Sequence, residues 1–600
     1  MHKLLIANRG EVALRVQRAA SDLGISTVAV YAQDDATSRH RRLAEEAYAL
    51  DGTGPSAYIA IDAMVDIARR SGCDAIHPGY GFLSERADFA QACVDAGITF
   101  VGPTVEQLAL FGDKGRALRL AQECRVPVMP ATAGGASLES ITRFFDEQEG
   151  AGVVIKAVGG GGGRGMRIVR RRDALAEAYA RCRSEAGSAF GVDTVYAERL
   201  VSRARHVEVQ IAGDGDDVIA LGERDCTLQR RFQKLVEIAP SPVLESAMRG
   251  LIIDCARMLA HRVGYRSLGT FEFLVEEDHA GAQQGFVFIE ANPRLQVEHT
   301  VTEQVTGVDL VALQLGLAAG RSLRDLGLDP ASPPEARGYS IQVRINAEST
   351  DAQGRARPAY GRLERFDPPT GPLVRVDTHG YTGYSPSPNF DNLLAKLIVT
   401  SITPRFEDAV RRLQRTLAEF RIEGVPTNLQ LLRAIAVRED FAAQRLHTRY
   451  FEEKVQELTA AAEALGAAEL EYSADRGVTP GAAAIPAPRT AEEAVAEGMV
   501  AVRAALSGRI VELPAQVGDL VQPEQTVAVL EAMKMEHEIA AERGGQVVER
   551  RLNVGSQALE GQVLLVLQPV NAEVEAQRTV ETVDPNAVRP DLQRVLDRHA

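Results

Sequence analysis

The chain has 600 residues, of which 45% are hydrophobic and 25% are charged, and its formal net charge is −15. This length predicts several domains, each with its own core, and the composition is that of a folded globular protein. The negative charge argues against nucleic acid or an anionic membrane as a partner, since phosphate binding needs a basic face. No segment reaches the roughly 20 apolar residues that a membrane span needs.

The six cysteines are widely spaced and form no CxxC pair. This spacing does not indicate a zinc site or a disulfide framework, so we expect most of them to be small buried residues. The first residues, MHKLLIANRGE, contain too short an apolar run for a signal peptide. We therefore expect a cytoplasmic protein.

Strand and helix patterns alternate along residues 2–112. Lys3–Ala7 and Thr27–Tyr31 are predicted strands, and Glu11–Leu23 is a predicted helix. Such alternation is typical of a parallel sheet covered by helices. The loop HPGYGFLSE, residues 77–85, follows another predicted strand, where open α/β sheets place ligands. A purely structural turn is an equally good interpretation of this loop by itself.

A run of five glycines, residues 159–163, lies between the predicted strands 152–158 and 166–169. Because glycine has no Cβ, such a turn lets backbone N–H groups close over a polyphosphate. Lys156 in the first strand, and Lys114 before an amphipathic helix, are candidate phosphate ligands. The run is not a P-loop, because the GxxxxGK[ST] pattern is missing.

The stretch FVFIEANPRLQVE, residues 286–298, begins as a strand and ends in a cluster of charge. Glu290 and Asn292 lie on one face of the extended chain, and a carboxylate with an amide suits Mg²⁺. A short connection could pair this strand antiparallel with Thr270–Val275. That hairpin would bring Glu272 close to Glu290, so that the two carboxylates could share a divalent metal.

Charges on either side of this hairpin suit an anion. Arg294 and Glu298 follow the strand, and an arginine with a second carboxylate can hold an anion and deprotonate it. The segment ERDCTLQRRFQK, residues 223–234, supplies a local basic island that ends at Lys234.

Residues 501–568 contain an internal repeat. GRIVE at Gly508 recurs as GQVVE at Gly545, and Val517-Gly518 recurs with the same offset as Val554-Gly555. Two copies of a short β unit predict a small sandwich with pseudo-twofold symmetry. The segment LEAMKMEH between them places Lys534 in the connecting turn.

Several motifs in order, HPGYGFLSE, IKAVGGGGGRGMRIV, ERDCTLQRRFQK, FIEANPRLQVEHTVTE and RINAE, together resemble the biotin carboxylases. These are the ATP-grasp enzymes that carboxylate biotin, and the resemblance covers residues 1 to about 450. EAMKM in turn resembles the attachment motif of biotin carboxyl carrier domains, with Lys534 as the biotinylated residue. The resemblance implies ATP, Mg²⁺ or Mn²⁺, bicarbonate and covalent biotin as ligands.

The resemblance assigns roles to individual residues. For the nucleotide it implies Lys114, Lys156, Gly161, Gly162, Gly163, Glu198, Val201, His206 and Gln229. For the metal it implies Glu272 and Glu290, with Asn292 beside them. For bicarbonate it implies Lys234, Arg294 and the backbone of Gln296 and Val297, with Glu298 as general base and Arg344 as the group that stabilises the biotin enolate. Phe232 departs from the pattern, because some members carry histidine there and its ribose contact is lost.

The expected fold class is α/β and α+β, with an ATP-grasp biotin carboxylase followed by a small all-β biotinyl sandwich. The expected domains are an N-terminal domain 1–112, an ATP-grasp domain 113–330 with its lid at about 130–205, a β-rich C-terminal domain 331–455, a flexible linker 456–500, a biotin carrier domain 501–570 and a tail 571–600. The linker is predicted from its Ala, Glu, Gly and Pro content.

The predicted function is ATP-dependent carboxylation of biotin on Lys534, through carboxyphosphate, within an acyl-CoA carboxylase. The expected partners are a carboxyltransferase subunit or domain, a biotin protein ligase and further copies of the chain. One alternative is that the sequence is the N-terminal part of a single-chain acyl-CoA carboxylase. Others are a different ATP-grasp ligase, of the carbamoyl-phosphate or purine-pathway kind, and a carrier without catalysis.

Overall fold

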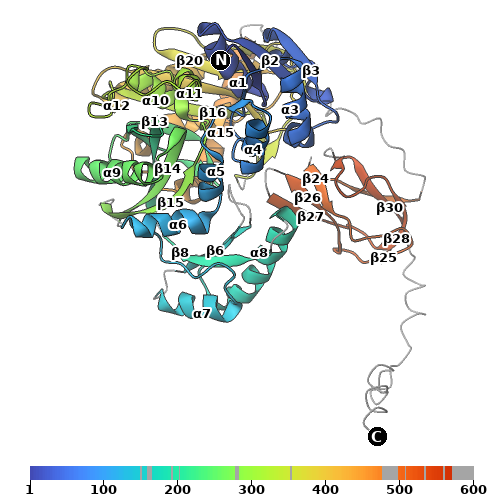
Figure 1. Cartoon of the computed structure of the whole chain (residues 1–600). Helices are drawn as coiled ribbons and strands as arrows, with labels where there is room; N and C mark the ends of the chain where they lie inside the picture. Colours follow the sequence, from blue (N-terminus) through green and yellow to red (C-terminus); the bar gives the residue numbers. More distant parts are fainter. Residues whose placement is uncertain are drawn as a thin grey trace. The chain divides into compact units, whose positions relative to one another are not determined.

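The computed structural model describes most of the chain (Figure 1). The described residues are 1–148, 152–158, 165–190, 193–201, 203–277, 283–351, 354–475, 498–506, 508–532, 535–558 and 561–569. The chain divides into two compact units, Met1–Pro488 and Arg489–Ala600. Within the described residues, no helix combines the length and the apolar character needed to cross a bilayer.

The first unit begins with a five-stranded parallel sheet. In spatial order its strands are β3 (Glu46–Ala49), β2 (Ser26–Tyr31), β1 (Lys3–Ile6), β4 (Ala75–His77) and β5 (Thr99–Phe100). The helices in the same part of the chain are α1 (Gly10–Asp22), α2 (Arg39–Leu43), α3 (Ile61–Arg70), α4 (Ala87–Asp95) and α5 (Val105–Phe111). The predicted parallel sheet is confirmed, and its apolar strands lie in the core because both faces are covered.

An eight-stranded antiparallel sheet forms the centre of the first unit. In spatial order its strands are β15 (Gln283–Asn292), β14 (Arg266–Glu277), β9 (Ala204–Asp214), β10 (Val218–Asp225), β13 (Val236–Ala239), β16 (Tyr339–Asn346), β21 (Leu393–Ser401) and β20 (Val374–Thr378). Strands β13 and β16 pair directly. The sheet is therefore continuous across residue 330, where the sequence predicted a domain boundary.

Helices cover the large sheet and carry its apolar contacts. Helix α9 (Ser246–Arg262) packs Ile252 and Leu259 into the core that β9 and β14 share. Helix α10 (His299–Thr306) packs Val301 and Val305 against β13 and β21. Helix α11 (Leu310–Ala318) packs into the core that also contains residues of β1 and α1.

A smaller antiparallel sheet contains the strands on either side of the glycine run. Its order is β7 (Met166–Val169), β6 (Val153–Ala157) and β8 (Val195–Arg199). The helices α7 (Leu138–Glu147) and α8 (Leu175–Phe190) share its core. Helix α6 (Lys114–Glu123) begins with Lys114 and is capped by the side chain of Asp113. Gly161, Gly162 and Gly163 lie outside the described residues.

The remaining part of the first unit is mixed. It contains the short strands β17 (Glu348–Thr350), β18 (Ala356–Pro358), β19 (Arg365–Asp367) and β22 (Arg421–Glu423), and the helices α12 (Phe406–Glu419), α13 (Leu429–Ala436), α14 (Glu439–Ala442) and α15 (Tyr450–Asp475). The linker predicted from residue 456 must be corrected, because α15 is helical to Asp475. Alanine and glutamate, which suggested a linker, are also strong helix formers.

The second unit consists of two four-stranded sheets. One has the order β23 (Val500–Arg503), β30 (Val563–Pro569), β28 (Gly545–Arg550), β25 (Leu520–Val521), and the other the order β27 (Met535–Ala540), β26 (Thr526–Ala532), β24 (Gly508–Glu512), β29 (Gln557–Ala558). The repeated segments β24 and β28 occupy the third position in their respective sheets. The predicted pseudo-twofold sandwich is therefore confirmed. The predicted tail, 571–600, lies outside the described residues.

Candidate active site

One lysine at the centre of the large sheet contacts three carboxylates. Nζ of Lys234 lies 2.5 Å from Glu298, 2.5 Å from Glu208 and 3.3 Å from Glu272. Burial alone would lower the pKa of Lys234, but these carboxylates raise its pKa well above the ordinary value. The ammonium is therefore charged, and it compensates negative charges that would be costly to bury alone.

Glu298 is the residue that immediately precedes α10, and it is almost fully buried. Besides Lys234, it accepts a hydrogen bond from Nη2 of Arg344 at 3.0 Å. Burial by itself would raise the pKa of Glu298, but the Lys234 and Arg344 cations lower its pKa below the ordinary range. Glu298 is therefore a carboxylate, which is the form that a general base requires.

Arg344 is oriented by a second carboxylate. It lies on β16, and its Nε donates to Glu237 on the neighbouring strand β13 at 2.5 Å. Gln342 on the same strand also donates to Glu237, at 3.0 Å. Glu237 thus holds one edge of the guanidinium, and the other edge contacts Glu298. The pairing of β13 with β16 therefore determines the position of the positive charge.

Glu272 and Glu290 stand directly opposite each other on β14 and β15. The predicted hairpin is therefore confirmed. Glu290 pairs with Lys114 at 3.1 Å, and the Lys114 ammonium lowers the pKa of Glu290. Glu272 accepts from Nδ2 of Asn292 at 2.8 Å and from Nε2 of Gln296 at 3.0 Å. Two ionised carboxylates with an amide beside them form a donor set that fits Mg²⁺.

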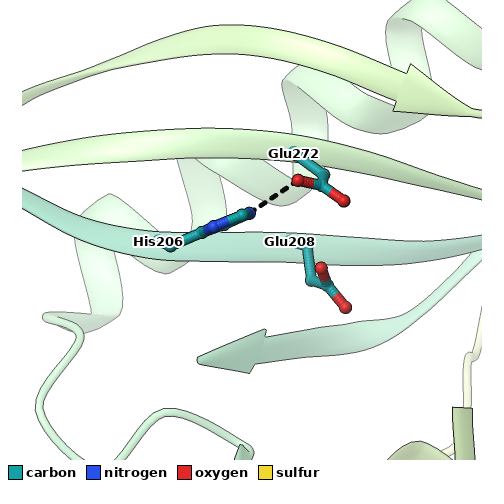
Figure 2. A group of neighbouring side chains, drawn as sticks. All are labelled: His206, Glu208 and Glu272. Carbon is teal, nitrogen blue, oxygen red and sulfur yellow. Dashed lines mark ion pairs between the residues drawn. The ribbon is translucent and has the colours of Figure 1, made fainter. Parts of the chain in front are cut away.

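A further acidic side chain belongs to this cluster (Figure 2). His206 and Glu208 project from β9 beside Glu272 on β14, and the His206 ring lies 2.7 Å from a Glu272 oxygen. Ligand atoms of these three residues lie within 4.8 Å of one another. Glu208 was missed by the sequence reasoning, although HVEVQI places it inside an apolar alternating strand, where a charge is unusual.

Arg294 joins the cluster to the N-terminal sheet. Its guanidinium forms an ion pair with Glu85 of the HPGYGFLSE loop and donates to Oδ1 of Asn292 at 2.9 Å. Glu85 of this loop therefore lies beside the candidate site residues, and the functional interpretation of the loop stays a prediction. Gln296 and Val297 lie between Arg294 and Glu298, in the turn before α10.

The predicted nucleotide residues fall into two groups. Lys156 on β6 forms an ion pair with Glu198 on β8, and Val201 follows that strand. On the large sheet, Nε2 of Gln229 lies 2.6 Å from Nδ1 of His206. Lys156 also contributes to lowering the pKa of Glu290, so its charge acts on the carboxylate pair.

Two further predictions concern Phe232 and Lys534. Phe232 lies in the turn between β11 (Gln229–Arg230) and β12 (Gln233–Lys234), where the residue is 51% exposed and has a φ of 67°. Lys534 lies outside the described residues. It stands in the sequence between β26 and β27, and these two strands pair with each other so that Ala532 faces Met535.

Comparisons with known families account for both units. Residues 1–108 match the biotin carboxylase N-terminal domain, and residues 113–326 match the ATP-binding domain of the carbamoyl-phosphate synthase L chain. Residues 342–453 match the biotin carboxylase C-terminal domain, and residues 495–567 match the domain of biotin-requiring enzymes. The chain belongs to the biotin carboxylase family. It is an ATP-dependent biotin carboxylase joined to a biotinyl domain, as the motifs predicted.

Relatives of this biotin carboxylase differ in how much of their length it covers. Pyruvate carboxylase of Bacillus subtilis is 44% identical over 461 residues, which are 75% of this chain and 39% of the relative. The biotin-dependent acyl-coenzyme A carboxylase alpha3 subunit of Mycobacterium leprae is 37% identical over 599 residues, which are 94% of this chain and 98% of the relative. The biotin carboxylase thus spans only about two fifths of the first relative but nearly all of the second.

Two solved structures are also similar to the biotin carboxylase. A single-chain, multi-domain long-chain acyl-CoA carboxylase is 39% identical, with a TM-score of 0.67, over 100% of this chain and 52% of that one. The biotin carboxylase domain of Hydrogenobacter thermophilus 2-oxoglutarate carboxylase is 41% identical, with a TM-score of 0.71, over 76% of this chain and 98% of that one. The latter was solved as a dimer with MgADP and bicarbonate.

Proposed function

We propose that this biotin carboxylase activates bicarbonate with ATP, transfers the carboxyl group to biotin on Lys534, and serves an acyl-CoA carboxylase. The observation that carries the proposal is the contact of Glu298 with both Lys234 and Arg344, at 2.5 and 3.0 Å. A buried carboxylate between two cations suits a base whose substrate is itself an anion. ADP and bicarbonate in the Hydrogenobacter domain support the same substrates here.

In the first step, Glu298 takes the proton of bicarbonate while Lys234 and Arg294 hold the anion. The bicarbonate oxygen then attacks the γ-phosphorus of ATP, the bond from that phosphorus to the β-bridging oxygen breaks, and carboxyphosphate and ADP result. Glu272 and Glu290, beside Asn292, would hold Mg²⁺ or Mn²⁺, which supplies charge neutralisation for the phosphates. Lys114 and Lys156 would add positive charge at the same oxygens.

The low pKa of Glu298 fits the role of a base because bicarbonate shares the cations that lower this pKa. A base works best when its pKa lies near the operating pH. Bicarbonate that binds between Lys234 and Arg294 adds a negative charge near Glu298 and partly neutralises these cations. Binding of the substrate should therefore raise the pKa of Glu298. The resting ion pairs thus keep the base ionised until bicarbonate is present.

The second step concerns biotin, which when attached to Lys534 supplies the ureido nitrogen that accepts the carboxyl group. We propose that carboxyphosphate breaks down to CO₂ and phosphate beside this nitrogen. The phosphate would take the proton of the nitrogen, and the nitrogen would then form its N–C bond with CO₂. Arg344 would offset negative charge on the ureido oxygen, because its guanidinium is already aligned by Glu237.

Replacement of Glu298 by glutamine tests the base. The Glu298→Gln variant should lose bicarbonate-dependent ATP hydrolysis by about 10²- to 10⁴-fold, the usual contribution of a general base. Release of ADP is measured with and without bicarbonate. Glu439→Gln, at a side chain that is 86% exposed, is the matched control and should behave as wild type. Undiminished turnover of Glu298→Gln would disprove the assignment.

The proposal of an acyl-CoA acceptor is supported by how much of each relative's length this chain matches. The alpha3 subunit is matched over 98% of its length, whereas the pyruvate carboxylase is matched over 39%. We therefore propose a carboxyltransferase on another subunit, a dimer of this chain, and a biotin protein ligase that modifies Lys534. We place these partners in the cytoplasm, because all six cysteines, each within the described residues, are free thiols.

The single-chain alternative is supported by a different observation. The long-chain acyl-CoA carboxylase matches the whole of this chain with 52% of its own length. Capture on streptavidin from the source cells, followed by mass spectrometry, distinguishes the two forms. A biotinylated chain with a separate transferase supports the subunit, and one much longer polypeptide supports the single-chain form. If nothing that carries Lys534 is retained, another ATP-grasp ligase is favoured. A captured chain that hydrolyses no ATP would favour a carrier without catalysis.

A further inference from the structure

Two consecutive carbonyl groups before α10 each accept a hydrogen bond from a fully buried side chain. Nδ1 of His299 lies 2.7 Å from the Gln296 carbonyl oxygen, and Nζ of Lys396 lies 3.1 Å from the Val297 carbonyl oxygen. We propose that His299 and Lys396 are positioning residues that orient the N–H groups of Val297 and Glu298 for bicarbonate. This proposal rests on the proposed function and concerns the same site.

Peptide geometry connects these contacts to the N–H groups. In a planar trans peptide the C=O of one residue and the N–H of the next point in opposite directions. Holding the Gln296 carbonyl therefore sets the direction of the Val297 N–H, and holding the Val297 carbonyl sets that of the Glu298 N–H. Over the part of the chain that the structure describes, neither N–H donates a hydrogen bond. Two unpaired N–H groups next to Arg294 and Lys234 are suitable donors for an anion.

His299 has one N–H to offer, and it is directed at this turn. Because a carbonyl oxygen only accepts, the contact places the proton on Nδ1. Burial lowers the pKa of His299 well below its ordinary value, and the nearby Lys396 charge lowers that pKa further. The ring is therefore neutral. Its other nitrogen, Nε2, is buried and has no hydrogen-bond partner among the described residues, so the ring's hydrogen bonding serves the turn alone.

Lys396 reaches the turn from β21 and is fully buried. Its ammonium is balanced by Glu11 on α1 at 3.1 Å and lies 3.8 Å from Asp377 on β20. Glu11 also accepts a hydrogen bond from the hydroxyl of Tyr80 in the HPGYGFLSE loop. Burying a lysine is costly unless partners compensate it. Here the compensated charge is aimed at one backbone carbonyl of the candidate bicarbonate site.

Two substitutions of His299 distinguish the effect of its N–H donor from the effect of its side-chain volume. Asparagine can place an N–H near the position of Nδ1, whereas leucine fills similar space without a donor. In bicarbonate-dependent ATP hydrolysis by the full chain, we expect His299→Leu to raise the KM for bicarbonate about tenfold, the scale of one lost hydrogen bond. The KM for ATP should change less than about twofold, and His299→Asn should restore the KM for bicarbonate to within about threefold of wild type.

His40→Leu is the matched control. His40 is also fully buried, and its Nε2 lies 3.1 Å from the carbonyl oxygen of Val30 in the N-terminal sheet. Losing that contact should lower stability and leave both KM values unchanged, because the Val30 carbonyl is not part of the turn before α10. A general loss of packing would therefore affect both leucine variants alike, whereas positioning would not.

A double variant tests the second donor and covers a failure of His299→Leu to fold. Lys396→Met with Glu11→Gln removes both members of a buried ion pair, which proteins tolerate better than removing one. Asp377 keeps its ion pair with Arg375 at 2.7 Å. The double variant should show the same selective rise in the KM for bicarbonate.

Three results would overturn the proposal in different ways. A wild-type KM for bicarbonate in folded His299→Leu and in the double variant would overturn it while the proposed function stands. Equal rises in the KM for ATP and for bicarbonate would show a merely structural role. A wild-type chain whose ATP hydrolysis does not respond to bicarbonate would overturn the proposed function and this inference together.

Discussion

Glu85 and Arg294, 209 positions apart in the sequence, form an ion pair between the HPGYGFLSE loop and the segment that follows β15. Arg294 is therefore not free in the resting site, and one carboxylate of the N-terminal sheet sets its direction. Because Glu85 is 42% exposed, the pair contributes little to stability. Its importance lies in the orientation of a guanidinium that we propose as a bicarbonate ligand.

Glu85→Gln should weaken bicarbonate binding without unfolding the protein. The glutamine side chain can still accept a hydrogen bond from Arg294, but it is neutral and cannot form an ion pair with the guanidinium. We expect the KM for bicarbonate to rise by up to about fivefold, which corresponds to about 1 kcal/mol for a partly exposed ion pair. Steady-state ATP hydrolysis at varied bicarbonate measures this. Glu453→Gln, at another partly exposed glutamate that pairs with Arg449, should leave that KM unchanged.

Lys234→Met should destabilise the protein as well as inactivate it. Without the ammonium, Glu208, Glu272 and Glu298 lose their common cation in a buried site, and breaking such a group costs about 3–5 kcal/mol. The free energy of unfolding is measured by urea denaturation. Lys454→Met is the control, because Lys454 is partly exposed and pairs with Glu457, which is 52% exposed. It should change stability by less than about 1 kcal/mol. Equal stabilities of the two variants would contradict the arrangement.

Glu290→Gln should weaken the binding of a divalent cation. The substitution removes one of the two opposed carboxylates and leaves Lys114 without its partner, so both charge and geometry become less favourable for a cation. We expect the dissociation constant for Mn²⁺ with bound ADP to rise at least about tenfold, as measured by electron paramagnetic resonance. Glu276→Gln, also at a β14–β15 position but paired with Arg199, serves as the control. A wild-type affinity in Glu290→Gln would exclude Glu290 as a ligand.

Stability should fall as the pH decreases from about 6.5 to 4. Burial lowers the pKa of both His40 and His77 to about 4, so in this range the unfolded chain binds protons that the folded chain does not. The stability from neutral histidine is therefore complete above pH 6.5 and is lost progressively down to the folded pKa. Each histidine should contribute about 2 kcal/mol of this loss between pH 7 and 5.

Urea denaturation at pH 7 and at pH 5 measures that loss. His77→Gln can keep a polar contact with Gln314, which lies 3.1 Å from the His77 ring, but it does not titrate. The variant should therefore show a smaller difference between the two pH values than wild type. An equal difference in the variant and in wild type would show that His77 does not contribute.

Much of this protein could be predicted because its signals are local. Alternation in Thr270–Val275 and Phe286–Glu290 predicted two strands, and their short connection predicted the hairpin that sets Glu272 opposite Glu290. The recurrence of GRIVE as GQVVE predicted the symmetry of the second unit. In each case the side-chain period of the strand, or the repetition itself, carries the information within a few residues.

The composition gave a wrong prediction for the linker, because the same residue types occur in linkers and in helices. Alanine and glutamate after residue 456 suggested a linker, but they continue α15 to Asp475. The first residues of this helix pack Leu458 into the core of the C-terminal part. Such packing depends on a partner surface that the local sequence does not contain.

The sequence by itself determined the family, the hairpin that sets Glu272 opposite Glu290, and most residues of the candidate site. Only the tertiary structure decided which charges meet. Glu237 reaches Arg344 because β13 pairs with β16, Glu85 reaches Arg294 from the first sheet, and Lys396 reaches the Val297 carbonyl from β21. These partners are far apart along the chain, and only the packing of distant strands brings them within a few ångströms of each other. Burial then strengthens the electrostatic contacts of Glu237 with Arg344 and of Lys396 with the carbonyl.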